Sequence, residues 1–207
     1  AATTGTTLRG GTVQLQNNAT ANSLRMSGGV LNMTGNASVN GLTATGGTLN
    51  VSGNNKLSGT VGLGNMDVNF VRSGSTARTL TVDNLAASGT RMNMNVDLVN
   101  QTADKLTVNS SYSGNTTLHL TNVATQANAT SGDGVILVEF GPAATVDGTV
   151  SLAGGVWEEG AHEYTLHQGT QSQEGKDYYL RSDGSYTKLF KGMLNVPALN
   201  ASLARAG

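Results

Sequence analysis

The chain has 207 residues, no cysteine, a net charge of −1 and only 12% charged residues. The missing cysteines exclude a disulfide framework and thiolate metal sites, and the near-zero charge gives no electrostatic reason to expect nucleic acid as a partner. Regular spacing of the hydrophobic residues, which make up 37% of the chain, argues against disorder.

Residues 1–65 repeat with a step of about 18 residues. Segments 10–15, 28–33 and 46–51 each consist of two glycines followed by a stretch in which apolar and polar residues alternate. Alternation with a period of two predicts a strand with one buried face. A second short alternating segment follows about ten residues later in each unit, and Gly, Asn and Ser separate the two, as turns require.

This repeat predicts an all-β chain that coils. Strands packed this densely leave no room for a helix, and a hairpin meander would need a turn such as Asn40-Gly41 in every unit, where it does not recur. We therefore predict a right-handed single-stranded parallel β-helix, a solenoid in which Val13, Leu31 and Leu49 stack in the core. At about 20 residues per coil, the chain would make roughly ten coils.

An asparagine recurs at one predicted turn of each unit, at Asn18, Asn36 and Asn54. Stacked asparagines satisfy each other's amide hydrogen bonds from coil to coil. We therefore expect an asparagine ladder through these three residues, with a structural role.

The repeat changes after Asn55. The glycine column continues at Gly64, but the apolar residues Met66 and Val68 have slipped by one position, which indicates a change in turn length. Between residues 64 and 115 the coils are expected to lengthen toward about 25 residues.

The chain beyond residue 100 has a different composition. It contains every aromatic residue except Phe70 and ten of the 13 acidic residues. The last coil of a stack leaves open backbone edges and an exposed core, and aromatic rings cover a large apolar area. We expect a stalk over 1–100, an aromatic-rich capping region of the same β-helix over 101–184, and a tail or linker, which can be disordered, over 185–207.

Motifs in this second region carry a family resemblance. Segments 104–108 with 114–122, then 132–138, 160–166 and 177–182, resemble in order and spacing the pertactin-like autochaperone region at the end of a type V autotransporter passenger. The upstream Gly-Gly-Thr-rich repeats resemble the coils of self-associating adhesin autotransporters.

The resemblance implies a surface-displayed structural module. It would promote passenger folding and export through an outer-membrane β-barrel translocator in cis, and it would present an adhesin or virulence factor at the bacterial cell surface or outside the cell. The residues to which it gives structural or autochaperone roles are Asp104, Leu106, Gly114, Gly132, Gly134, Trp157, Tyr164, Tyr178, Tyr179 and Leu180.

No residue pattern predicts catalysis. His162 and His167 would point to opposite faces of one strand, so they cannot share a metal ion. His119 is expected to face outward and Asp133 to serve a turn. No Gly-x-Ser-x-Gly elbow is present. We expect no catalytic residue, no cofactor and no metal.

Two alternatives to the folding module stay open. The rod itself could be an adhesion or self-association surface, with a host cell-surface molecule or another copy of itself as partner. A polysaccharide-active β-helix enzyme is disfavoured, because residues 1–65 hold no Asp or Glu for a catalytic groove. Neither nucleic acid nor a small-molecule substrate is expected as a partner.

Overall fold

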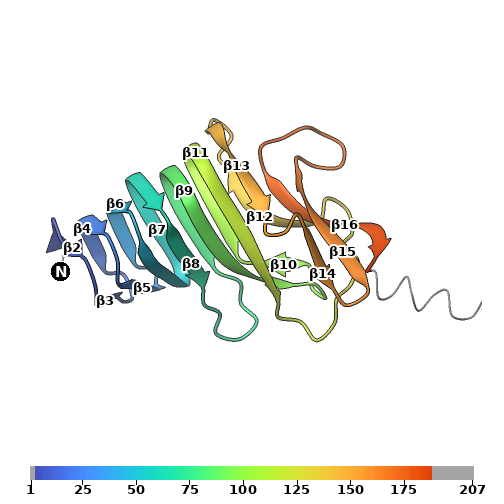
Figure 1. The fold of residues 1–207 in the computed structure, drawn as a ribbon, viewed down its shortest axis with the longest axis horizontal. Coiled ribbons are helices and arrows are strands. Elements are labelled where there is room, and N and C mark those ends of the chain that lie inside the picture. The colour runs from blue at the N-terminus through green and yellow to red at the C-terminus, as the bar shows by residue number, and fades with distance from the viewer. Residues whose placement is uncertain (1–2, 188–207) are drawn as a thin grey trace, which may run out of the picture.

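A computed structural model of the chain describes residues 3–187, and these residues form one 16-stranded sheet without a helix. The strands are β1 (Thr3–Thr4), β2 (Thr7–Leu8), β3 (Thr12–Leu15), β4 (Thr20–Met26), β5 (Val30–Gly35), β6 (Ser38–Ala44), β7 (Gly47–Gly64), β8 (Met66–Phe70), β9 (Thr79–Asp97), β10 (Thr102–Ala103), β11 (Lys105–Asn122), β12 (Val135–Phe140), β13 (Thr145–Leu152), β14 (Val156–Glu159), β15 (His162–Gln168) and β16 (Tyr178–Tyr186). They lie side by side along a rod (Figure 1).

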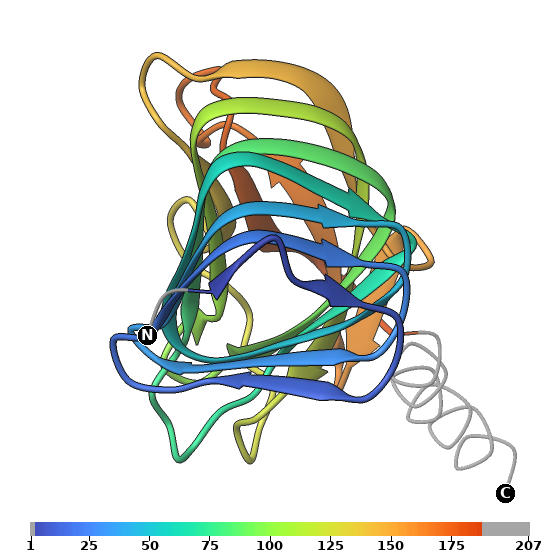
Figure 2. The ribbon, with the colours of Figure 1, turned by 90° about the vertical axis from the view of Figure 1, so that its left-hand side faces the viewer.

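The rod is a parallel β-helix, as predicted. Apart from the two-residue β10, which pairs antiparallel with the end of β9, each strand from β1 to β11 pairs in parallel with a strand one coil later. The last parallel pairings join β11 to β12 and β13. Viewed from the N-terminal end, the chain turns clockwise as it recedes, so the coil is right-handed (Figure 2).

The coils lengthen along the rod. Hydrogen-bonded side chains on neighbouring coils are 18 residues apart between β4 and β6, 24 between β8 and β9, 27 between β9 and β11, and 34 between β11 and β13. The first change is a bulge: Asn40 pairs with Ser58, but Leu42 pairs with Val61. The change expected after Asn55 is thus confirmed, and the longer coils explain why the rod has fewer turns than the roughly ten expected.

A single hydrophobic core runs along the axis from Leu8 to Leu180. The predicted stacking of Val13, Leu31 and Leu49 is confirmed by their pairing in register. The same column continues through residues of β8, β9, β11 and β13, namely Val68, Met92, Leu118 and Leu152. Each buried side chain therefore packs against its counterparts in the coils before and after it.

The expected asparagine ladder is present between Asn18 and Asn36 but does not reach Asn54. Asn36 Nδ2 lies 3.5 Å from Asn18 Oδ1, but Asn54 is exposed and pairs forward with Thr79. The corner has changed shape: Gly35 has a positive φ of 64°, whereas Gly53 lies inside the continuous strand β7 without one.

A longer amide ladder runs along the outer surface of β3, β5, β7, β8 and β9. It consists of Gln14, Asn32, Asn50, Asn69 and Asn93, joined by amide hydrogen bonds of 2.9, 2.8, 3.0 and 2.6 Å. These residues alternate with core residues within strands, so the period-two pattern holds them on the outer face at every coil.

The C-terminal end of the rod departs from the coil. β16 pairs antiparallel with β12, and β15 and β14 follow in an antiparallel meander. These strands lie at the end of the rod opposite the N-terminus (Figure 1). β16 extends to Tyr186, so the tail expected from residue 185 begins inside a strand; residues 188–207 lie outside the described residues.

Candidate functional site

The candidate site is the closing end of the β-helix, where aromatic rings cover the core. Tyr112 and Phe140 lie with ring centroids 5.6 Å apart, and Tyr178 packs edge-on against Phe140 at 6.4 Å. The hydroxyl of Tyr112 donates a hydrogen bond to the backbone oxygen of Thr149 at 2.9 Å. Burial raises the pKa of Tyr112, so its hydroxyl stays a neutral donor.

A second pair of rings fixes the meander on the core. Tyr164 is fully buried, and its ring lies 5.4 Å from that of Trp157. The Tyr164 hydroxyl donates to the backbone oxygen of Asn128 at 2.7 Å, which ties the 123–134 loop to β15. Burial, with a smaller contribution from Glu159, raises the pKa of Tyr164 to about 12. The rings of Trp157 and Tyr164 therefore cover the core with apolar surface, and the Tyr164 hydroxyl has a hydrogen-bond acceptor.

Side chains of the cap also satisfy backbone groups at the end of the last coil. The Asp177 carboxylate accepts from the Phe140 backbone N–H at 2.7 Å, and Lys176 Nζ donates to the Ala144 oxygen at 2.6 Å. Ser182 and Thr130 exchange backbone-to-hydroxyl hydrogen bonds of 2.8 and 2.9 Å. These contacts occupy groups that would otherwise form an open sheet edge.

Two of the predicted glycines stand where backbones approach closely. Gly114 has a φ of 86°, and a Cβ there would overlap the backbone oxygen of Ala87 in the preceding coil. Gly134 has a φ of 89°, and a Cβ there would overlap the Leu180 oxygen of β16. Gly132 also has a positive φ, of 54°, but its surroundings are open.

Asp104 is a buried anchor one coil before the closing end. Its carboxylate is fully buried and pairs with Arg72 Nε at 3.0 Å. Leu106 follows in the core, paired with Leu80 before it and with Val138 after it.

The structure brings part of the predicted set together and separates the rest. Trp157, Tyr164, Tyr178 and Leu180 meet in the cap and pack on the core. Tyr179 faces the other side of β16, where its ring lies 5.5 Å below the Arg181 guanidinium, because successive strand residues point to opposite faces.

Phe140 is one of the aromatic residues expected in the cap, and it ends the strand of the 132–138 motif. Lys176, which stands directly before the 177–182 motif, was not singled out from the sequence. The partnership of Arg72 with Asp104 has no spacing signal, because 32 residues separate them.

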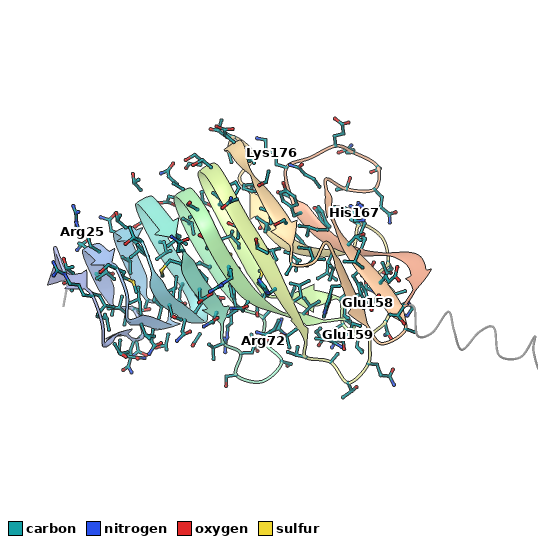
Figure 3. The ribbon with its side chains drawn as sticks, viewed as in Figure 1. Arg25, Arg72, Glu158, Glu159, His167 and Lys176 are labelled. Atoms are coloured by element: carbon teal, nitrogen blue, oxygen red, sulfur yellow. The ribbon has the colours of Figure 1, made fainter. Side chains whose placement is uncertain are left out.

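The described residues contain no cluster of metal-ligating side chains. No group of three His, Asp or Glu side chains within residues 3–187 could hold a metal ion, and no helix in that part of the chain could span a membrane. His119 is exposed, and Asp133 lies in a turn and accepts from the Gln171 backbone N–H at 2.8 Å, as predicted for both. Glu158, Glu159 and His167 lie on the antiparallel cap strands (Figure 3).

Comparison with known proteins places the chain in a family. A search of curated proteins found no match. The Pertactin family model matches residues 58–180, more than half of the chain. The match begins in β7 and ends in β16, so it covers the lengthened coils and the cap described above. The chain therefore belongs to the Pertactin family and is a β-helical module of an autotransporter passenger.

Proposed function

We propose that the closing end of this module acts as an autochaperone, which folds first and templates the coils before it during export through an outer-membrane β-barrel in cis. The proposal contains no catalytic step. The observation that carries it is the difference in pairing between the cap and the rod: β14 to β16 pair antiparallel with sequence neighbours, whereas every coil pairs with residues at least 18 positions away.

Local pairing favours early folding of the cap. Glu159 pairs with His162 across a tight turn, so little loop-closure entropy opposes the first hairpin. In the coils, local antiparallel pairing is limited to the two residues of β10 against the end of β9, and a coil cannot bury its apolar face alone. Once β12 and β16 have formed a rigid edge, β11 can add to it, and each added coil becomes the template for the next.

Surface display of the full-length passenger tests this proposal. Tyr164→Ala and Trp157→Ala remove rings that hold the meander on the core, and we expect each to lower display strongly. Tyr179→Ala is the matched control, because that ring packs outside the core against Arg181. Wild-type display of Tyr164→Ala and Trp157→Ala would contradict the proposal, as would an equal loss in the control.

A second candidate function is self-association through the face that carries the amide ladder. Asn32, Asn50 and Asn69 each use one donor and one acceptor within the ladder, which leaves further hydrogen-bonding groups toward solvent. Residues 1–65 carry three cations and no carboxylate, so this part of the face is mostly neutral and suits a flat polar partner, either a second copy or a host cell-surface molecule.

Cell settling discriminates this second candidate. Thr48→Arg places a bulky cation on the ladder face beside Asp67, which pairs with Thr48 and can accept the new charge. Thr60→Arg is the control on another face, where Thr60 pairs with Asn84. If the ladder face mediates association, Thr48→Arg abolishes settling of cells that display the passenger and Thr60→Arg preserves it; equal settling of both removes the candidate.

A further inference from the structure

The buried carboxylate of Asp104 gathers donors from three separate stretches of chain. Its Oδ1 accepts from Arg72 Nε at 3.0 Å and from the Arg78 backbone N–H at 2.8 Å. Its Oδ2 accepts from the backbone N–H and the side-chain amide of Asn95 at 2.8 and 2.7 Å. Arg72 also donates to the Asn95 backbone oxygen at 2.9 Å, so the three residues form a closed network.

These donors all belong to the coil that precedes Asp104. Arg72 follows β8, Arg78 precedes β9, and Asn95 lies near the end of β9, while Asp104 stands directly before β11. The Arg72 side chain is 5% exposed and that of Asp104 is not exposed at all. Figure 3 places Arg72 near the edge of the rod where the β9 coil turns. The network therefore sits where β9 and β11 begin their long parallel pairing.

Hydrophobic patterning alone does not fix the register at this point. β9 begins with Leu80-Thr81-Val82 and β11 with Leu106-Thr107-Val108, paired in that order. A shift of one residue would turn the core side chains outward. A shift of two residues, in contrast, keeps apolar residues facing the core, so the local alternation tolerates it.

We infer that Asp104 and Arg72 form a register clasp that selects the native pairing of β9 with β11. In the native register the carboxylate receives four hydrogen bonds, one of them from the Arg72 guanidinium. A shift of two residues separates the carboxylate from the Arg78 backbone N–H. If Asp104 moves along with β11, the shift also breaks its bonds to Asn95, which continue the β9–β10 pairing. The shifted register therefore leaves a buried charge with fewer partners, which disfavours it. Fixing register is a well-supported role for a buried ion pair whose contribution to stability is small.

Cysteine cross-linking of the purified chain tests the clasp, because the native sequence contains no cysteine. Thr81→Cys/Thr107→Cys joins residues paired in the native register, and Thr79→Cys/Thr107→Cys joins residues that meet only after a two-residue shift. Neighbouring strands bring paired Cα atoms within disulfide range. In the otherwise wild-type chain we expect oxidation after refolding to link only the native pair.

The variant Arg72→Met/Asp104→Asn removes both charges and keeps an amide that can bond to Asn95. In this background we expect the yield of the shifted disulfide to rise at least about tenfold, with the far-ultraviolet circular dichroism of a folded β-helix. Arg72→Lys, which keeps the ion pair, is the conservative control and should give the native disulfide alone.

A folded Arg72→Met/Asp104→Asn chain that links only the native pair overturns the inference. If that variant does not fold, Asp104→Asn alone is used. Arg72 then loses its carboxylate partner, but it lies in the loop after β8, where its guanidinium can turn toward water. If neither variant folds, the ion pair is needed for stability rather than for the choice of register, and the inference is overturned as well. The readout needs no export, so it succeeds or fails independently of the proposed autochaperone function.

Discussion

The first coils and the closing end of this rod are stabilised by different means. Residues 3–65 form coils of nearly constant length with an aliphatic core, an external amide ladder and no carboxylate. Residues 66–187 form longer coils with a buried ion pair and an aromatic antiparallel cap. The regular part depends on nearest-neighbour stacking that any similar coil can supply, whereas specific contacts concentrate in the second part, where the family match also lies.

The largest expected effect separates the cap from the rod. Tyr164→Ala removes a fully buried ring and its hydrogen bond to Asn128, which should lower the free energy of unfolding by about 3–5 kcal/mol. Urea denaturation of the purified chain measures this change. Tyr179→Ala, on the outer face, should cost less than about 1 kcal/mol. Equal losses in the two variants would show that burial of the ring in the cap does not matter for stability.

A core substitution in the first coils should act locally. Leu49→Ala removes a fully buried side chain stacked between Leu31 and Val68, at a cost of about 2–5 kcal/mol. Because each coil contacts only its neighbours, hydrogen exchange should accelerate in β5, β7 and β8 and stay unchanged in β15 and β16. Uniform acceleration along the whole chain would contradict this picture of independent local contributions.

Gly114 and Gly132 separate the cost of a steric overlap from the cost of an unfavourable backbone conformation. Gly114→Ala meets both a positive φ and the Ala87 oxygen, so we expect a loss of about 3 kcal/mol. Gly132→Ala meets only the positive φ, with open space around it, and should cost about 1–2 kcal/mol. Thermal unfolding of the two variants measures the difference between their losses of stability. Equal losses would mean that the coils can move apart at Gly114 without cost, which would contradict the expectation.

Acid should weaken the lengthened coils before the first coils. Hydrogen bonding to Arg91 lowers the pKa of Asp67, bonding to Asn109 lowers that of Asp83, and bonding to Asn100 lowers that of Asp97, each from 3.8. A lowered folded-state pKa contributes stability above the unfolded value, and this stability is lost as the pH falls through the folded-state pKa.

Residues 1–65 contain no carboxylate that could respond in the same way. Hydrogen exchange at pH values stepped below 3.8 should therefore show β8, β9 and β11 losing protection before β4 to β6. These interactions lie near the surface, where solvent screens them, so the effect is moderate. Loss of protection in the first coils before the lengthened coils would be the opposite of the expected order.

The smallest effect concerns the amide ladder. Asn50→Ala removes hydrogen bonds of 2.8 and 3.0 Å to Asn32 and Asn69, which should cost about 1 kcal/mol. Asn54→Ala, at an exposed position outside the observed ladder, should change stability by less than about 0.5 kcal/mol. Chemical denaturation can resolve the two, and a larger loss for Asn54→Ala would restore the ladder first expected from the sequence.

The sequence predicts the coil well because its repeat is itself the structural period. Leu31 and Leu49 stack as expected, and the slip at Met66 marks the bulge in β7. The expected ladder links Asn18 with Asn36 but stops before Asn54, where the corner at Gly53 lacks the positive φ of Gly35. The longer ladder repeats at the same step, so the repeat alone does not show which column of amides is continuous.

Other features of the closing end leave no such trace in the sequence. The aromatic residues predict a cap, but composition does not specify that β16 runs antiparallel to β12. The alternation of Tyr178, Tyr179 and Leu180 along one strand does indicate which ring faces outward. Arg72 reaches Asp104 only because the fold brings distant turns together, which local patterning cannot reveal.

Pulse-labelling hydrogen exchange during refolding of the chain tests the central claim most directly, because it reports when each strand becomes protected. If the closing end templates the rod, amides of β12, β15 and β16 acquire protection first, followed by β11, then β9, and last β4 to β6. Protection that appears in β4 to β6 before β15 and β16 would contradict the account.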